Sequence, residues 1–295
     1  MLTLFTTPKP FLGHCAVIQR NALKSWTLVH PDAEVILFGD EKGAADTCQE
    51  LNLRHEPYVR RNENGTKYLN YIFDRARELS RHNILCYANC DIILGSDFRA
   101  ALELTSRTYS EFLMMGRRWD ADITEPRDFE QPDWDAQLRS LALRSGKQNG
   151  PTWIDYFCFS RDLYFRKMPP FLIGRTGWDP WLIWFARKSR VRLVDASRMV
   201  VAVHQNHDYA YLKQGVASLH SQSEARYNWS LGDDKSWHYY SADAATDRLK
   251  RGQVRPNRLA WFGPVKCRAI YNCYSIWFSL LNLTRPIRHP LGLRR

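Results

Sequence analysis

The sequence predicts a single α/β domain with a mostly parallel sheet, followed by a C-terminal amphipathic helical extension. Residues 1–95 alternate three times between apolar strand patterns and helical patterns, which is typical of βαβ units. An uncharged strand pattern then ends in polar side chains, and a charge-free stretch with helical spacing lies near the C-terminus. The 295 residues, 44% hydrophobic and 25% charged, have the composition of an ordinary globular protein.

The first part of the chain is expected to form three strand–helix units. We expect strands at 2–6, 34–38 and 53–55, and helices at 15–28, 44–51 and 67–80. Pro8 and Pro10 end the first strand, and the helix at 67–80 carries Leu69, Ile72 and Phe73 on one face. Right-handed crossovers would bring the carboxyl ends of the strands to one edge of the sheet, where open α/β folds bind their ligands.

The stretch 83–94 is the one around which we expect the sheet to be organised. Ile84, Leu85 and Tyr87 favour a central strand because they are β-formers without charge. Asn89 and Asp91 follow where this strand should end. Their oxygen atoms could hold a divalent cation, and the cation could hold a diphosphate. The alternative is that both side chains form an Asx turn or cap the next helix.

The rest of the chain continues the α/β pattern less regularly. We expect strands at 112–116, 153–159, 191–194 and 199–203, a short helix at 136–144, and a helix that begins at Asp179-Pro180. The polar stretch between the first two of these strands is long for a connection, and such stretches are usually functional or mobile. The predicted domain is 1–247, with halves 1–110 and 111–247, and the extension is 248–295.

Three pairs of carboxylate-type residues are spaced as a metal site requires. They are Asn89 with Asp91, Asp120 with Asp122, and Asp133 with Asp135. Spacing does not choose among them, because any acidic loop produces such pairs by chance. Position favours the first pair, since a buried strand end fixes geometry better than a loop. We therefore predict the metal site at Asn89 and Asp91.

Two further positions have residue types suited to catalysis. His204 directly continues a strand pattern, with His207 close behind, and imidazole is a common ligand of Mn²⁺-type ions. The alternative for each histidine is a structural role. Asp179 could cap a helix whose first position is Pro180, or it could act as a general base on the helix tip. Both roles of Asp179 are compatible, because a capping side chain is held in place.

Several residues after the early strands are candidates for nucleotide contacts. Asp40 and Glu41 could accept hydrogen bonds from a nucleobase or ribose, and Thr6 and Asn89 would share their sheet edge. Asn62 and Thr66 lie in a polar loop that could contact phosphate. The alternative for Asp40 and Glu41 is an ordinary turn, and no Walker spacing or GxGxxG is present.

Together these segments resemble the GT-A class of nucleotide-sugar glycosyltransferases, in particular bacterial proteins with a degenerate Asp-x-Asp. The resemblance covers residues 1 to about 245 and rests on the order and spacing of five segments. These are Ile18-Gln19-Arg20-Asn21-Ala22, Phe38-Gly39-Asp40-Glu41, Tyr87-Ala88-Asn89-Cys90-Asp91-Ile92, Gly177-Trp178-Asp179 and Val203-His204-Gln205-Asn206-His207.

The resemblance implies a GT-A-like, Rossmann-like fold that transfers a sugar from a nucleotide-diphosphate sugar, most simply a UDP-sugar, to a hydroxyl acceptor. It implies Mn²⁺ or Mg²⁺ on the diphosphate, with Asp91 and His204 as ligands and Asn89 where an Asp is usual. Asp179 matches the base of inverting members, and the resemblance implies that residues 119–134 help to form the acceptor or lid side. Asn89 removes one negative charge, which implies a weaker metal site or less dependence on the metal.

The C-terminal extension carries the whole net charge of the protein. Residues 248–295 contain eleven Lys and Arg and no Asp or Glu, so residues 1–247 sum to zero against the total of +11. The stretch 269–284 has no charge and shows one narrow polar stripe at helical spacing. We expect a helix in the interface of an anionic membrane, serving a glycan or lipid-linked acceptor. The alternatives are a helix that docks on the domain or one that dimerises.

Other classes of function fit the sequence less well. A nucleic-acid-binding protein is suggested by the sequence pI of about 9.4, but the neutral body and the lack of a recognition motif argue against it. A nucleotidyltransferase would need a Gly-rich basic loop after the first strand, and residues 6–10 match such a loop poorly. A non-catalytic nucleotide-sugar-binding protein stays open as an alternative, because Asn89 stands where a second carboxylate is expected. Seven scattered cysteines argue against zinc and a disulfide framework, and we expect a cytoplasmic, peripherally membrane-associated protein without a signal peptide.

Overall fold

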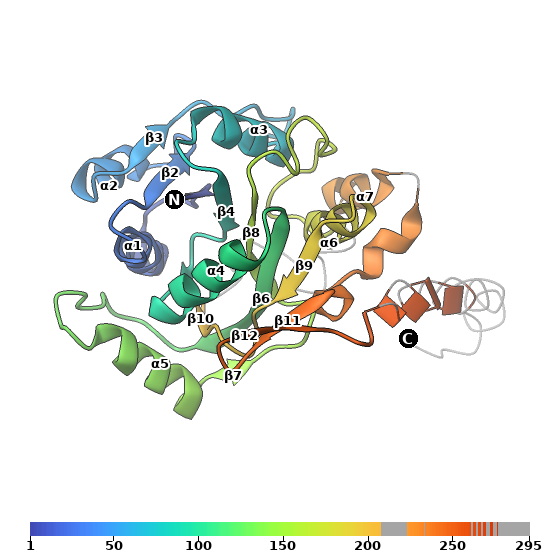
Figure 1. Ribbon diagram of the computed structural model, residues 1–295. Helices are drawn as coiled ribbons and strands as arrows, with labels where there is room; N and C mark the ends of the chain where they lie inside the picture. Colours follow the sequence, from blue (N-terminus) through green and yellow to red (C-terminus); the bar gives the residue numbers. More distant parts are fainter. Residues whose placement is uncertain are drawn as a thin grey trace, which may run out of the picture.

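The computed structural model is an α/β fold with one central sheet and helices on both of its faces (Figure 1). It describes residues 1–207, 223–232 and 234–260, together with isolated positions between 262 and 276. The predicted α/β class and the three early strand–helix units are confirmed, with element ends shifted by at most two residues. Among the described residues, no helix combines the length and the apolar character needed to cross a membrane.

The main path of the sheet has the order β12-β11-β9-β6-β8-β4-β1-β2-β3. Its strands are β1 (Leu2–Thr6), β2 (Glu34–Phe38), β3 (Arg54–Glu56), β4 (Ile84–Ala88), β6 (Phe112–Ala121), β8 (Ile154–Ser160), β9 (Arg192–Asp195), β11 (Asp247–Lys250) and β12 (Gln253–Pro256). Three short strands lie off this path, namely β5 (Ile92–Ile93), β7 (Lys147–Gln148) and β10 (Ala202–Gln205).

All strands on this path run in one direction except β8 and the edge strand β12. Strand β8 is inserted between β4 and β6 and is antiparallel to both. The carboxyl ends of β1, β2, β4 and β6 therefore meet at one edge of the sheet. The amino end of β8 lies at that same edge, because β8 points the opposite way.

Helices cover both faces of the sheet. On one face α1 (Gly13–Leu28), α2 (Ala44–Glu50) and α4 (Ser96–Thr108) bury apolar residues against the strands, and on the other face α3 (Leu69–Leu79) and α6 (Trp178–Lys188) do the same. Helix α5 (Trp134–Ser145) packs beside β6 and β10 in a smaller cluster. The chain continues through α7 (Ser223–Ser230) and the 3₁₀ turns η2 (Lys235–Tyr239) and η3 (Ala242–Ala244).

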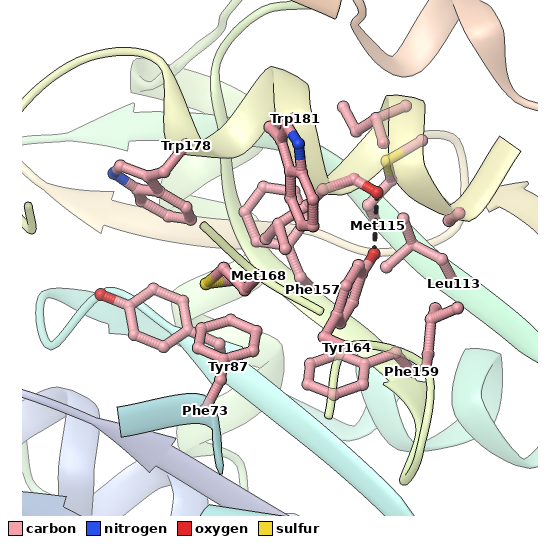
Figure 2. Packing of buried hydrophobic residues seen from close by; sticks show 14 of the residues in the cluster. Phe73, Tyr87, Leu113, Met115, Phe157, Phe159, Tyr164, Met168, Trp178 and Trp181 are labelled. Atoms are coloured by element: carbon pink, nitrogen blue, oxygen red, sulfur yellow. Dashed lines mark hydrogen bonds between the residues drawn. The ribbon is translucent and has the colours of Figure 1, made fainter. Parts of the chain in front are cut away.

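Aromatic side chains fill the layer between α3, α6 and the sheet (Figure 2). The Phe73 ring stacks on Phe159 with centroids 5.5 Å apart, and Trp178 meets Tyr87 edge-to-face at 5.3 Å. Burial of each such side chain stabilises the fold by about 1.5–3 kcal/mol. Because Trp178 is the first residue of α6, its contact with Tyr87 of β4 fixes the start of this helix beside the strand end.

Three sequence expectations need correction. Residues 248–256 are not part of an extension, because β11 begins at Asp247 and pairs in parallel with β9. Helix α6 is capped by Gly177, whose φ of 111° is left-handed, so Asp179 lies inside the first turn and is not the cap. Strand β6 is longer than 112–116 and contains Asp120. The helix predicted at 269–284 falls mostly outside the described residues.

Candidate functional site

A cleft of about 550 Å³ opens at the sheet edge where the carboxyl ends of β1, β2 and β4 meet. Its floor comes from the loop after β1, the loop after β4 and the amino end of β8, and the start of α6 forms one wall. Of the predicted site residues it is lined by Glu41, Thr66, Asn89, Asp91, Asp179 and His204. None of residues 119–134, the expected acceptor or lid side, is among the lining residues.

Asp91, His204 and His207 form a cluster that could hold a metal ion. One ligand atom of each residue lies within 4.8 Å of the others. The sheet register creates this proximity, because β10 pairs antiparallel with β5 and places His204 opposite Ile92, the residue after Asp91. Main-chain pairing thus brings Asp91 close to His204, as the sequence predicts. The sequence favours His204 over His207 as a metal ligand, because His204 directly continues a strand. In the structure both histidines belong to the cluster.

The Asp91 carboxylate is electrostatically prepared for a cation. Its Oδ2 lies 3.2 Å from Nε2 of His207 and 3.8 Å from Nε2 of His204. Its Oδ1 is buried and has no hydrogen-bond partner among the residues that the structure describes. Burial raises the pKa of Asp91, but the hydrogen bond with His207 and the neighbouring histidine charges outweigh it and lower the pKa to about 2. The carboxylate is therefore ionised at neutral pH.

His204 is held in place by a carboxylate on its far side. Its Nδ1 lies 3.1 Å from Asp120, which also pairs with Arg118 at 2.8 Å. The ring thus lies between two carboxylates, with Nδ1 on the side of Asp120 and Nε2 on the side of Asp91. Burial lowers the pKa of His204, against the raising effect of the negative charge of Asp91. Asp120 therefore lies beside a histidine of the cluster, whereas Asp122 accepts a hydrogen bond from Asn206.

Asn89 faces Asp155 at the start of β8. Its Nδ2 donates to Oδ1 of Asp155 at 2.8 Å, and its backbone N–H donates to the carbonyl of Asp155 at 2.9 Å. The second oxygen of Asp155 accepts from Arg118 at 2.7 Å. The amide of Asn89 therefore completes a chain of polar contacts that runs through Arg118 and Asp120 to His204. Asn89 lines the cleft but contributes to the support of the cluster through its amide nitrogen.

Asp179 has the opposite electrostatic character to Asp91. It lies in the first turn of α6 and lines the same cleft. Burial and the charge of Asp155 raise the pKa of Asp179 to about 7, against the lowering effect of backbone amides at the helix start. A carboxyl group with this pKa can accept a proton near neutral pH and is a stronger base than an ordinary carboxylate.

Basic side chains supply positive charge to the same cleft. Lys9, Arg61, Lys67, Arg118 and Arg175 line it. Lys67 is buried, lies 2.5 Å from Glu41, and has its pKa lowered by burial. Gly39, with a φ of 119°, leaves the space for this ion pair, because a Cβ there would lie 2.4 Å from Nζ of Lys67.

Three predicted nucleotide contacts are absent from the residues that line the cleft. Thr6 is fully buried in the core, since side chains alternate along β1 and Thr7 faces the cleft instead. Asp40 is exposed and pairs with Arg61. The side-chain Oδ1 of Asn62 accepts from the N–H of Thr66 at 2.8 Å within its own turn, and the Nδ2 of Asn62 donates to Glu224.

The other acidic pairs have structural roles away from the cleft. Asp122 accepts from Asn206 at 2.7 Å, and Asp133 accepts from Gln137 within α5. Asp135 accepts from the N–H of Ser96 at the start of α4. The site residues that sequence reasoning missed are Lys67, Arg118, Asp155 and Arg175. Asp155 carried a signal, because it stands at the amino end of an apolar strand that turned out to be antiparallel.

Comparisons with known proteins give distant structural similarity. No family model matches the chain, and no curated protein matches it. It is similar to glucosyl-3-phosphoglycerate synthase from Mycobacterium tuberculosis in complex with Mg²⁺ and UDP, with 16% identity over 75% of this chain and 78% of that one and a TM-score of 0.42. S. aureus TarS 1-349 in complex with UDP-GlcNAc matches at 6% identity, with coverage of 70% and 59% and a TM-score of 0.46. The bifunctional IspDF from Campylobacter jejuni also matches, at 6% identity, with coverage of 72% and 54% and a TM-score of 0.40.

Proposed function

We propose that this protein is a metal-dependent glycosyltransferase that moves a sugar from a nucleotide-diphosphate sugar to a hydroxyl acceptor. One observation carries the proposal, namely that a single cleft holds a cation-binding cluster and a separate carboxyl group tuned as a base. The pKa of Asp91 is about 2 and that of Asp179 about 7. Two carboxyl groups with such different pKa values, facing one cavity, suit a reaction that needs both a metal ligand and a proton acceptor.

The residues present fit a divalent cation. Asp91, His204 and His207 would hold it, and the buried Oδ1 of Asp91 supplies a ligand atom that has no other partner among the described residues. Two imidazoles favour Mn²⁺ over Mg²⁺, which prefers oxygen ligands. When bound, the ion would neutralise charge on the diphosphate of the donor. Lys9, Arg61 and Arg175 on the same walls would bind the remaining phosphate charge.

Asp179 would act as the general base. Its carboxylate takes the proton from the acceptor hydroxyl, the hydroxyl oxygen forms a bond to the anomeric carbon, and the bond from that carbon to the diphosphate oxygen breaks. Attack opposite the leaving diphosphate inverts the anomeric centre. Of the predicted nucleotide contacts we retain Glu41 and Thr66, which line the cleft.

The acceptor is proposed to be a glycan or a lipid-linked precursor of a polysaccharide at a membrane surface. The chain after β12 supports this, because large apolar side chains at Leu259, Phe262 and Val265 are exposed beside basic ones. Apolar residues interleaved with basic ones favour binding at the interface of an anionic membrane. In this proposal the protein is a cytoplasmic enzyme that associates with the membrane peripherally.

A thermal-shift screen of nucleotide sugars with and without Mn²⁺ tests the proposal. We expect one donor to raise the melting temperature, and we expect the rise to depend on Mn²⁺ in the wild type and to be lost in Asp91→Asn. The matched control is Asp133→Asn, since Asp133 lies outside the cleft. If no nucleotide sugar stabilises the protein at any Mn²⁺ concentration, the proposed function is wrong.

A further inference from the structure

A second hollow of about 290 Å³ lies at the β9 and β11 end of the sheet. Its lining combines the loop after β9 with the β11–β12 hairpin and the segment that follows it. The lining residues are Arg198, Arg248, Lys250, Arg255, Pro256, Asn257, Arg258 and Leu259. Five of these eight side chains are cationic and none is acidic, so the hollow concentrates positive charge from two separate parts of the chain.

Most of this positive charge is uncompensated. Arg248 lies 3.8 Å from Asp195, and it is the one lining cation for which the described residues provide a counter-ion. Arg198, Lys250, Arg255 and Arg258 are exposed and make no ion pair within the described part of the chain. Like charges gathered around a concave surface repel one another and raise the local concentration of anions. Arginine dominates the set, and its planar fork matches phosphate geometry.

The hollow is supported by a fixed backbone. The N–H of Asn257 donates to the carbonyl of Thr246 at 2.8 Å, and its Nδ2 donates to that of Ala245 at 2.8 Å. Arg187 of α6 donates to the carbonyl of Ala260 at 2.9 Å. The segment that carries Arg255 and Arg258 is therefore tied to the body on both sides. The backbone of a site held in this way loses little entropy when a ligand binds.

We propose that this hollow binds the phosphate of an anionic lipid headgroup and orients the enzyme on the membrane. The exposed Leu259 on its rim, followed by the exposed Phe262 and Val265, supplies the apolar surface that a bilayer accepts. Strand β11 runs parallel to β9, which runs parallel to β6, so Arg198 and Lys250 lie at the same edge of the sheet as the catalytic cleft. The inference rests on the membrane-bound acceptor of the proposed function and specifies its docking site.

The test measures binding of the full chain to phosphatidylcholine vesicles with and without phosphatidic acid. Arg198 is diagnostic, because it lies outside the basic segment 248–295 and contributes only if the folded hollow is the site. We expect Arg198→Gln with Arg255→Gln to weaken binding about 30-fold, since each basic residue near an anionic surface contributes about 1 kcal/mol. The matched control is Arg107→Gln with Arg144→Gln, two exposed arginines on α4 and α5, and it should change binding by less than about threefold.

Several outcomes would overturn the inference. These are equal weakening by the two double variants and absence of wild-type binding to the acidic vesicles. Tighter binding to random duplex DNA than to vesicles, with the same dependence on Arg198, would assign the hollow to nucleic acid. The thermal shift by the nucleotide sugar should be unchanged in Arg198→Gln with Arg255→Gln, so failure of the lipid site and failure of the proposed function are separable.

Discussion

The strand end that carries Asp91 and the helix start that carries Asp179 face the same cleft but give their carboxyl groups opposite properties. Asp91 lies between two imidazoles, and its pKa is about 2. Asp179 lies in the first turn of α6, where burial and the negative charge of Asp155 raise its pKa to about 7. Burial raises the pKa of both groups, so the difference comes from the sign of the neighbouring charge. In the proposed function, the first carboxyl group is a metal ligand and the second is a base.

The two regions also differ in how they are held. Asp91 is positioned by main-chain register, because β10 pairs with β5 and brings His204 alongside. Asp179 is positioned by packing, because the Trp178 ring meets Tyr87 in the core and fixes the helix start (Figure 2). Backbone pairing tolerates changes of side chain, whereas packing does not. We therefore expect the Asp179 side of the cleft to be more sensitive to mutations in the neighbouring core.

The largest effect is expected for Asp179→Asn. Loss of the proton acceptor should lower kcat by about 10²–10⁴-fold, the range for a general base. Donor binding should persist, because the cation cluster and the basic walls are unchanged. Steady-state kinetics give kcat, and the Mn²⁺-dependent thermal shift reports donor binding. Asp162→Asn, at an exposed residue paired with Arg77, is the control. Near-normal turnover of Asp179→Asn would remove Asp179 from the role of base.

A smaller effect is expected on the metal side, for Asp120→Asn. Loss of the carboxylate 3.1 Å from Nδ1 of His204 frees the ring to rotate and to change its tautomer. Removal of such a supporting group should weaken Mn²⁺ affinity by about 10–100-fold. Calorimetric titration of Mn²⁺ measures the change, with Asp133→Asn as the control. Unchanged affinity would mean that His204 is held by its burial alone, and would separate Asp120 from the metal site.

Much of the fold could be predicted from the sequence, because periodicity records which residues are buried. The apolar strand before Asn89 and the helix at 67–80 are both where the pattern places them. Proximity of Asp91 and His204 also followed, since strand ends meet at one edge. The direction of β8 did not follow, because its run of apolar residues is the same in either direction. Asp155 was missed for this reason, as only carboxyl ends of strands had been considered.

The contacts between side chains of the site could not be predicted from the sequence either. Asn89 was read as a weakened metal ligand, whereas its amide is directed at Asp155. Lys67 was placed at the start of an amphipathic helix, and its pairing with Glu41 depends on the turn at Gly39. Arg175 is held by Glu224, a residue far away in sequence. Such contacts depend on loops whose conformation is set by the whole fold.

A still smaller effect is expected for Asn89→Asp, which restores the Asp-x-Asp spacing. The new carboxylate would lose the 2.8 Å hydrogen bond to Asp155 and would repel it. We expect no gain in Mn²⁺ affinity and a loss of stability of about 1–3 kcal/mol, the cost of an unsatisfied buried polar group. Urea unfolding and Mn²⁺ titration test the two parts. A gain in affinity of tenfold or more would show that a carboxylate at position 89 turns toward the ion and can act as a ligand.

The stability of the protein should depend on Asp179 in the range where its pKa is displaced. The folded pKa is about 7 and the ordinary value is 3.8, so the native state binds more protons between these limits. The contribution of Asp179 to stability is therefore complete below pH 3.8 and is lost as the pH rises through about 7. The free energy of unfolding of Asp179→Asn should not show this decrease with pH. Urea unfolding of both proteins without metal across the range measures it, and parallel curves would contradict the raised pKa.

The finest test of the comparison is the pH profile of Asp155→Asn. A base must be ionised, so kcat/KM of the wild type should rise with pH through an apparent pKa near 7. The charge of Asp155 adds to burial in raising that pKa, and its removal should move the rise to lower pH. Loss of the Arg118 contact would by itself lower activity at every pH without moving the midpoint. A fall in activity with an unchanged midpoint would therefore limit the role of Asp155 to holding Arg118 and Asn89. A shifted midpoint, with no shift in the control Asp162→Asn, would show that the charge of Asp155 raises the pKa of Asp179.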